Sequence, residues 1–110
     1  IQEELKMPVT EANAQNFEEV TREGFVIVDL YGENCNPCKR FMKVIEELEF
    51  ELPFVNVVKV NTTQNKDIAA QKGVLGVPTI IFMKDGKEVK RNVGFMELEQ
   101  VKEVIGEQLY

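Results

Sequence analysis

The feature that most constrains the fold of this chain is a pair of cysteines placed between two strand-like segments. Cys35 and Cys38 follow the apolar run FVIVDLY (25–31) and precede FMKVIEELEFEL (41–52), whose apolar side chains recur at helical spacing. The next segment, FVNVVKV (54–60), is again strand-like. The pattern predicts a strand–helix–strand unit with a right-handed crossover, and it places both thiols at the start of the helix.

Two cysteines and no histidine leave metal binding, a structural crosslink or redox exchange as uses for the pair. A structural zinc site takes four Cys or His ligands, so carboxylates or a second subunit would have to complete it. A crosslink between residues this close in sequence closes a very short loop, which removes little entropy from the unfolded chain. A CxxC motif at the head of the helix in such a unit is typical of a redox site. We therefore predict redox chemistry without a metal.

Residues at the start of the predicted helix favour a stabilised thiolate at Cys35. Pro37 fits the first helical turn, where the helix loses no amide hydrogen bond. Cys35 then faces unpaired amides and the positive end of the helix dipole, which stabilise a thiolate. Lys39 and Arg40 carry the unfavourable sign for a helix start, but they add positive potential near that sulfur. The alternative is that these cations are ordinary solvated side chains.

The rest of the sequence predicts further elements around this unit. Asp85-Gly86 is the preferred pair for a type I′ turn and therefore predicts an antiparallel hairpin. The additional elements that we expect are an edge strand at 7–10, helices at 13–22, 65–73 and 96–110, and strands at 77–83 and 87–93. This order predicts the α/β class, with a mixed sheet and helices on both faces.

Length and charge limit what such a fold can bind. The chain has 110 residues and a net charge of −6, so we expect one domain over residues 1–110 that binds neither nucleic acid nor anionic membranes. No apolar run approaches the ~20 residues of a membrane span. The first residues lack the apolar core of a signal peptide. We therefore expect a cytoplasmic protein in which residues 1–6 form a loose N-terminal extension.

Several separated segments together resemble the thioredoxin family. VDLYGENCNPCK resembles the strand, loop and helix start of the family's active site, and VVKVN resembles the following strand. GVLGVPTIIFMKDGK resembles the cis-proline loop and hairpin, and VGF resembles the glycine-containing loop beside the site. The similarity covers Val9 to Leu109. It implies the thioredoxin fold, with a central mixed sheet of about five strands and helices on both faces.

The resemblance implies roles for individual residues. Cys35 resembles the attacking cysteine, Cys38 the resolving cysteine and Pro78 the cis proline. Asp29 resembles the buried carboxylate beneath the disulfide, and Lys59 resembles its partner on the next strand. Burial of Asp29 would raise its pKa toward neutrality, as a general base for Cys38 requires. The alternatives are an Asp29 that faces water at a strand end and a Lys59 that is an ordinary solvated residue.

The resemblance also implies partners and a substrate-binding surface around Cys35. The implied partners are a protein disulfide as substrate and a thioredoxin reductase or similar electron donor, with no metal or organic cofactor, and we expect a monomer. A backbone edge beside the cis proline would bind the substrate chain, with apolar contacts around it. The expected substrate-binding residues are Asn34, Asn36, Pro37, Gly76, Val77, Pro78, Gly94 and Phe95.

The chain departs from the family next to the cysteines. NCNPC stands where WCGPC is usual, so Asn34 and Asn36 occupy changed positions, and the chain has no tryptophan. Tyr31 stands where a second tryptophan is common, and Phe95 replaces a residue that is usually small. We predict that Phe95 supplies the aromatic contact beside Cys35 that the missing tryptophan would make. The alternative is that Phe95 turns inward and caps the last helix.

Three classes of function fit these features. The predicted class is a protein disulfide reductase that a reductase recharges. A disulfide isomerase, an oxidant or a glutaredoxin-like enzyme on the same scaffold is the second class, and a reduction potential near ~ −180 mV would favour an isomerase. A specialised electron carrier or binding module is the third, and an intact CxxC without activity on a generic protein disulfide would favour it.

Overall fold

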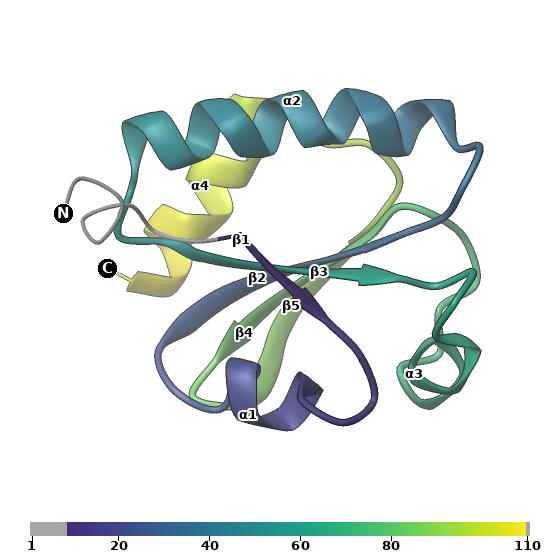
Figure 1. Ribbon diagram of the computed structural model, residues 1–110. Coiled ribbons are helices and arrows are strands. Elements are labelled where there is room, and N and C mark those ends of the chain that lie inside the picture. The colour runs from purple at the N-terminus through teal and green to yellow at the C-terminus, as the bar shows by residue number, and fades with distance from the viewer. Residues whose placement is uncertain (1–8, 110) are drawn as a thin grey trace, which may run out of the picture.

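The computed structural model describes residues 9–109, in which strands and helices follow one another in the predicted order (Figure 1). The expected loose extension at residues 1–6 lies outside the described residues. The elements are β1 Val9–Ala12, α1 Phe17–Thr21, β2 Phe25–Tyr31, α2 Asn36–Glu51, β3 Asn56–Asn61, α3 Lys66–Gln71, β4 Thr79–Lys84, β5 Lys87–Val93 and α4 Leu98–Leu109. Within residues 9–109, none of the helices is long and apolar enough to cross a membrane.

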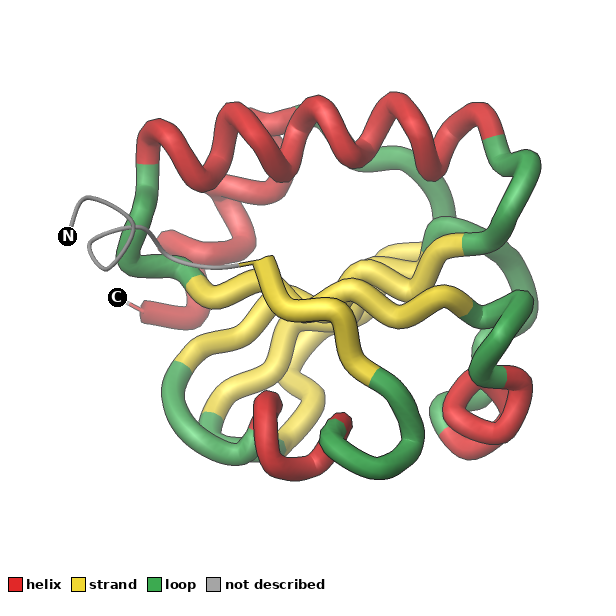
Figure 2. Tube along the Cα trace, viewed as in Figure 1, coloured by secondary structure: helices red, strands yellow, loops and turns green. Residues whose placement is uncertain are grey.

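β2 is the central strand of a five-stranded mixed sheet with the order β1-β3-β2-β4-β5. β3 pairs in parallel with both β1 and β2, whereas β4 is antiparallel to β2 and β5 is antiparallel to β4. Figure 2 shows the sheet as a twisted layer with α2 and α4 on one side and α1 and α3 on the other. The predicted mixed sheet with helices on both faces is confirmed.

Each face of the sheet packs in its own apolar core. Ile27 and Val57 belong to the core beneath α2 and α4, which also holds Phe41 of α2. Val28 belongs to the core on the face of α1 and α3. Because helices cover β2 on both faces, its sequence is a nearly continuous apolar run. Full burial of one large apolar side chain stabilises the fold by ~1.5–3 kcal/mol. Side chains alternate along a strand, so Asp29 lies on the α2 face with Ile27.

Several element boundaries differ from the sequence pattern. The strand expected at 77–83 is β4 Thr79–Lys84, because Val77 and Pro78 lie in the loop with the cis peptide bond. A helix was expected over 13–22, but α1 covers Phe17–Thr21. The Asn13 side chain accepts hydrogen bonds from the amides of Gln15 and Asn16, at 2.9 and 3.1 Å, and this turn competes with a helix. The edge strand β1 covers Val9–Ala12 rather than 7–10, and residues 7 and 8 lie outside the described residues.

The hairpin between β4 and β5 turns where the sequence predicts it. Asp85 and Gly86 have φ angles of 51° and 83°, as the two central residues of a type I′ turn require. The Asp85 side chain also accepts a hydrogen bond of 2.9 Å from the amide of Gly24. This turn lies beside the start of β2, whereas the two cysteines follow the other end of that strand.

Candidate active site

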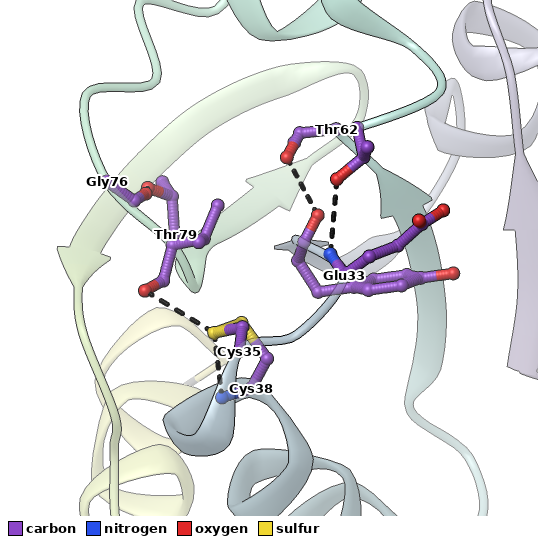
Figure 3. The surroundings of a disulfide bond; sticks show 9 residues. Glu33, Cys35, Cys38, Thr62, Gly76 and Thr79 are labelled. Atoms are coloured by element: carbon purple, nitrogen blue, oxygen red, sulfur yellow. Dashed lines mark hydrogen bonds between the residues drawn. A yellow bond between two sulfur atoms is a disulfide. The ribbon is translucent and has the colours of Figure 1, made fainter.

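Cys35 and Cys38 form a disulfide at the N-terminus of α2 (Figure 3). Cys35 is the N-cap residue, and Pro37 lies in the first turn of the helix, as predicted. The Cys38 amide donates a hydrogen bond of 3.2 Å to Cys35 Sγ. In the reduced protein this donor and the positive end of the helix stabilise a thiolate at Cys35. Cys35 is half-buried and Cys38 is 3% exposed, so an incoming disulfide reaches the Cys35 sulfur first.

The loop before β4 lies against Cys35. The Val77–Pro78 peptide bond is cis, and the Val77 carbonyl oxygen lies 3.8 Å from Cys35 Sγ. The Thr79 hydroxyl donates to the Gly76 carbonyl oxygen at 2.6 Å, and the Gly94 amide donates to the Pro78 carbonyl oxygen at 2.7 Å. These bonds join the segments that contain Gly76, Pro78 and Gly94, so the structure brings these predicted site residues together beside the disulfide.

The loop that leads from β2 to Cys35 also approaches this segment closely. A Cβ atom on Gly32 would lie 3.2 Å from the Val77 side chain, so a larger residue at position 32 would push Val77 away. Asn34 adopts a left-handed φ of 58°, which Asn tolerates better than most residues do. Asn34 and Asn36 are exposed on either side of Cys35. They border the Cys35 sulfur with polar side chains.

Asp29 is fully buried on the sheet face that α2 covers, with 0% of its surface exposed. Neither carboxylate oxygen has a hydrogen-bond partner among the described residues. Burial raises the pKa of Asp29 from 3.8 to about 7, with the positive charge of Lys59 acting in the opposite direction and the negative charge of Glu11 adding to the rise. A carboxyl group of this kind exchanges its proton near neutral pH.

Lys59 lies directly beside Asp29 in the parallel pairing of β3 with β2. Its ammonium group does not bond the carboxylate of Asp29, but lies 5.5 Å from the centroid of the Tyr31 ring. Lys59 also lines a pocket of about 310 Å³ that reaches Cys38. The residues that line this pocket are Tyr31, Gly32, Glu33, Asn34, Cys38, Lys39, Met42 and Lys59. Cys38 and Lys59 therefore line the same pocket.

Tyr31 and Glu11 belong to this region, although the sequence pattern did not identify Glu11. The Tyr31 hydroxyl donates a hydrogen bond of 2.8 Å to Glu11 Oε2. Burial, followed by the hydrogen bond to Glu11, raises the pKa of Tyr31 to about 12. The one signal for Glu11 in the sequence is a charged residue within the short strand VTEA, and its position becomes clear only from the pairing of β1 with β3.

Phe95 is half-buried rather than openly exposed beside Cys35. Its ring packs edge-on against Phe41 of α2, with centroids 6.4 Å apart and an interplanar angle of 88°. The guanidinium group of Arg40 lies 4.2 Å from the Phe95 centroid. Contacts with α2 therefore cover part of the ring, and the role of Phe95 as the aromatic contact beside Cys35 stays a prediction. The Phe95 ring contacts Phe41 and Arg40 of α2. The alternative stated from the sequence was that Phe95 turns inward and caps the last helix.

Two exposed apolar side chains near the cis-proline segment were not predicted. Leu75 is 96% exposed and precedes Gly76. Val93, at the end of β5, is 59% exposed and lies so close to Gly76 that a Cβ there would be 3.4 Å from it. Both add exposed apolar surface next to Gly76.

The fold and the site together define a thiol–disulfide oxidoreductase, which acts through dithiol–disulfide exchange. Its two sulfurs lie at a helix N-terminus, one accessible and one enclosed, with a buried carboxyl group on the sheet face beneath that helix. Among residues 9–109, no group of three His, Cys, Asp or Glu side chains is placed to hold a metal ion.

Comparison with known proteins identifies the family. The sequence profile named Thioredoxin matches residues 8–107. Thioredoxin from Bacillus subtilis (strain 168) is 35% identical over 104 residues, covering 94% of this chain and 100% of that protein. Thioredoxin from Chlamydia muridarum is 40% identical over 90 residues, covering 82% and 88%. The solved structure of a mutant thioredoxin from Halobacterium salinarum NRC-1 superposes with a TM-score of 0.82 at 29% identity, covering 89% and 88%. The chain belongs to the thioredoxin family.

Proposed function

We propose that this protein reduces disulfide bonds of other proteins in the cytoplasm, as a single-domain monomer without a metal or organic cofactor. A thioredoxin reductase or a similar donor would return the Cys35–Cys38 disulfide to the dithiol. The observation that carries the proposal is the unequal burial of the two sulfurs, with the Cys38 amide donating to Cys35 Sγ. A cytoplasmic setting fits this role because reductants there keep thiols reduced.

The first step uses Cys35. The Cys35 thiolate attacks one sulfur of the substrate disulfide, forming a mixed disulfide and releasing the other substrate sulfur as a thiolate. The helix N-terminus and the Cys38 amide stabilise the attacking thiolate. The Val77 carbonyl oxygen, 3.8 Å from Cys35 Sγ, offers the backbone edge against which the substrate chain would lie.

The second step uses Cys38 and Asp29. Cys38 gives its proton to the Asp29 carboxylate, and the resulting thiolate attacks Cys35 Sγ. The mixed disulfide breaks, the second substrate sulfur leaves as a thiolate, and the Cys35–Cys38 disulfide forms. The substrate gains two electrons and the protein loses two. Asp29 suits this role because its burial, without a hydrogen-bond partner among the described residues, raises its pKa to about 7.

The proposed substrate-binding surface surrounds Cys35. Gly76, Val77 and Pro78 supply the backbone edge, and Leu75 and Val93 extend it with exposed apolar side chains. The remaining proposed contacts are Asn34, Asn36, Pro37, Gly94 and the part of Phe95 that α2 leaves exposed. An apolar surface of this kind favours substrates that carry apolar residues beside their disulfide.

The experiment that tests the proposal is reduction of insulin disulfides with turnover by a thioredoxin reductase. Cys35→Ser should abolish reduction, whereas Cys38→Ser should attack once and remain as a mixed disulfide. A trapped complex with Cys35→Ser instead of Cys38→Ser would show that the two roles are reversed. A reduction potential near ~ −180 mV would replace the reductase assignment by that of an isomerase.

A further inference from the structure

A row of charged residues crosses the sheet on the face beneath α2. The strand register pairs Glu11 of β1 with Lys59 of β3, and it pairs Lys59 with Asp29 of β2. The residues two positions earlier in these strands, Val9, Val57 and Ile27, pack in the core beneath α2 and α4. Because side chains alternate along a strand, Glu11, Lys59 and Asp29 lie on that face too. Lys59 therefore lies between two carboxyl groups. Of these, Asp29 is fully buried and Glu11 is exposed.

Tyr31 connects the outer carboxylate with the cation. Its hydroxyl donates to Glu11 Oε2 at 2.8 Å, and its ring lies 5.5 Å from Lys59 Nζ, within the range of a cation–π contact. The Asp29 oxygens have no hydrogen-bond partner among residues 9–109, so Lys59 contacts the ring while leaving the neighbouring carboxylate unbonded. Lys59 thus contacts a ring whose hydroxyl group is hydrogen-bonded to Glu11.

We propose that Glu11 is a positioning residue for the resolving step, because by fixing Tyr31 it keeps Lys59 from bonding Asp29. The Asp29 carboxylate then remains available for the proton of Cys38. The inference rests on the proposed role of Asp29 as the base. An opposite charge that moves within ~4–6 Å of a carboxylate lowers its pKa by about 1–3 units, which would make Asp29 a weaker base near neutral pH.

Charged and uncharged neighbours from several elements lie near Asp29. β1 contributes Glu11, β2 contributes Tyr31, β3 contributes Lys59, β4 contributes the apolar Ile80, and α2 contributes Cys38, with Glu33 and Lys39 at the same pocket. Burial is the largest influence on the pKa of Asp29. Lys59 lowers this pKa and Glu11 raises it, so loss of Glu11 shifts the balance toward Lys59.

Three variants of the full chain separate positioning from simple charge. Glu11→Ala removes both the hydrogen bond to Tyr31 and the charge, and Glu11→Gln removes the charge but keeps an acceptor. Tyr31→Phe keeps the Glu11 charge and removes the hydroxyl, with its hydrogen bonds to Glu11 and Asn61. The readout is the pH midpoint of Asp29, followed by NMR of its carboxyl carbon in the oxidised protein. Glu11→Ala and Tyr31→Phe should each lower the midpoint by about one unit or more, and Glu11→Gln should lower it less than Glu11→Ala does.

Glu19→Ala is the matched control, because Glu19 is an exposed carboxylate on α1, on the other face of the sheet, and should leave the midpoint unchanged. An unchanged midpoint in Glu11→Ala would overturn the proposal. So would a Glu11→Gln shift as large as that of Glu11→Ala together with no shift in Tyr31→Phe, since Glu11 would then act only as a charge. Asp29→Asn tests the base role separately from the role of Glu11. If this variant releases substrate at the wild-type rate at every pH, the base role fails. The Asp29 midpoint in the Glu11 and Tyr31 variants still tests whether Glu11 keeps Lys59 from bonding Asp29.

Discussion

The two sides of the active site are built in opposite ways. Behind Cys38, Asp29 is fully buried without a hydrogen-bond partner among the described residues, which disfavours its charged form. In front of Cys35, Leu75 and Val93 present apolar side chains to solvent, 96% and 59% exposed. We expect the buried carboxyl group on the inner side to cost stability and to serve the chemistry, and we expect the exposed side chains on the outer side to affect docking at little cost to the fold. Substitution of Asp29 should therefore change stability and the rate of the chemistry, whereas substitution of Leu75 should change the KM for a protein disulfide.

The largest expected effect on stability comes from Asp29→Asn. The folded protein holds the Asp29 proton more tightly than the unfolded chain does, because the pKa rises from 3.8 to about 7 on folding. Ionisation of Asp29 therefore lowers the stability of the wild type as the pH rises from about 4 to about 7, by a contribution of about 4 kcal/mol in total. The amide that replaces the carboxyl group cannot ionise, so the variant should be more stable than the wild type by an amount that grows across this range and is constant above it.

Urea unfolding of both proteins at pH 4, 6 and 8 measures this difference. Asp67→Asn is the control, since Asp67 is exposed on α3 and its substitution should change the free energy of unfolding by less than ~0.5 kcal/mol. A stability that falls in Asp29→Asn at pH 8 would mean that the carboxylate is paired in the folded protein. That result would remove the contrast between the two sides of the site.

Phe95→Ala should have an intermediate effect, since Phe95 lies between the two sides. Its ring packs against Phe41 and beneath Arg40 but is only half-buried, so the expected loss of stability is about 1–3 kcal/mol, below that of a core Phe. Phe50→Ala is the matched control, because Phe50 is 89% exposed and should cost less than ~0.5 kcal/mol. Thermal unfolding of the two variants checks this, and equal losses would show that the contacts of Phe95 with α2 contribute nothing.

Leu75→Ser should have the smallest effect on stability. At 96% exposure its loss should change the free energy of unfolding by less than ~0.5 kcal/mol. The KM for a protein disulfide should rise several-fold while kcat and the reduction of a small disulfide stay unchanged, because the lost contact serves docking alone. Phe54→Ser is the control, because Phe54 is 59% exposed and precedes the start of β3, at the end of the strands opposite the cysteines, so it should leave the KM unchanged. An unchanged KM in Leu75→Ser would place the docking surface elsewhere.

The sequence allowed the element order and the position of the redox pair to be predicted because both depend on local patterns. Alternating and helical periodicities report which residues face a core, and CxxC before an amphipathic helix reports where the thiols lie. The contacts of Glu11 could not be predicted, since they require the register between β1 and β3, which are far apart in the sequence. The placement of Phe95 was also out of reach, because Arg40 and Phe41 meet it only in the folded chain.

The central claim is that Asp29 accepts the proton of Cys38 when the mixed disulfide is resolved. The most direct test is the single-turnover rate of substrate release as a function of pH, in the wild type and in Asp29→Asn. We predict that the wild-type rate rises with a midpoint near the Asp29 pKa of about 7. In Asp29→Asn this midpoint should vanish, and the rate near neutral pH should fall by ~10²-fold, as for loss of a general base. Identical rates and pH profiles for the two proteins would contradict the account.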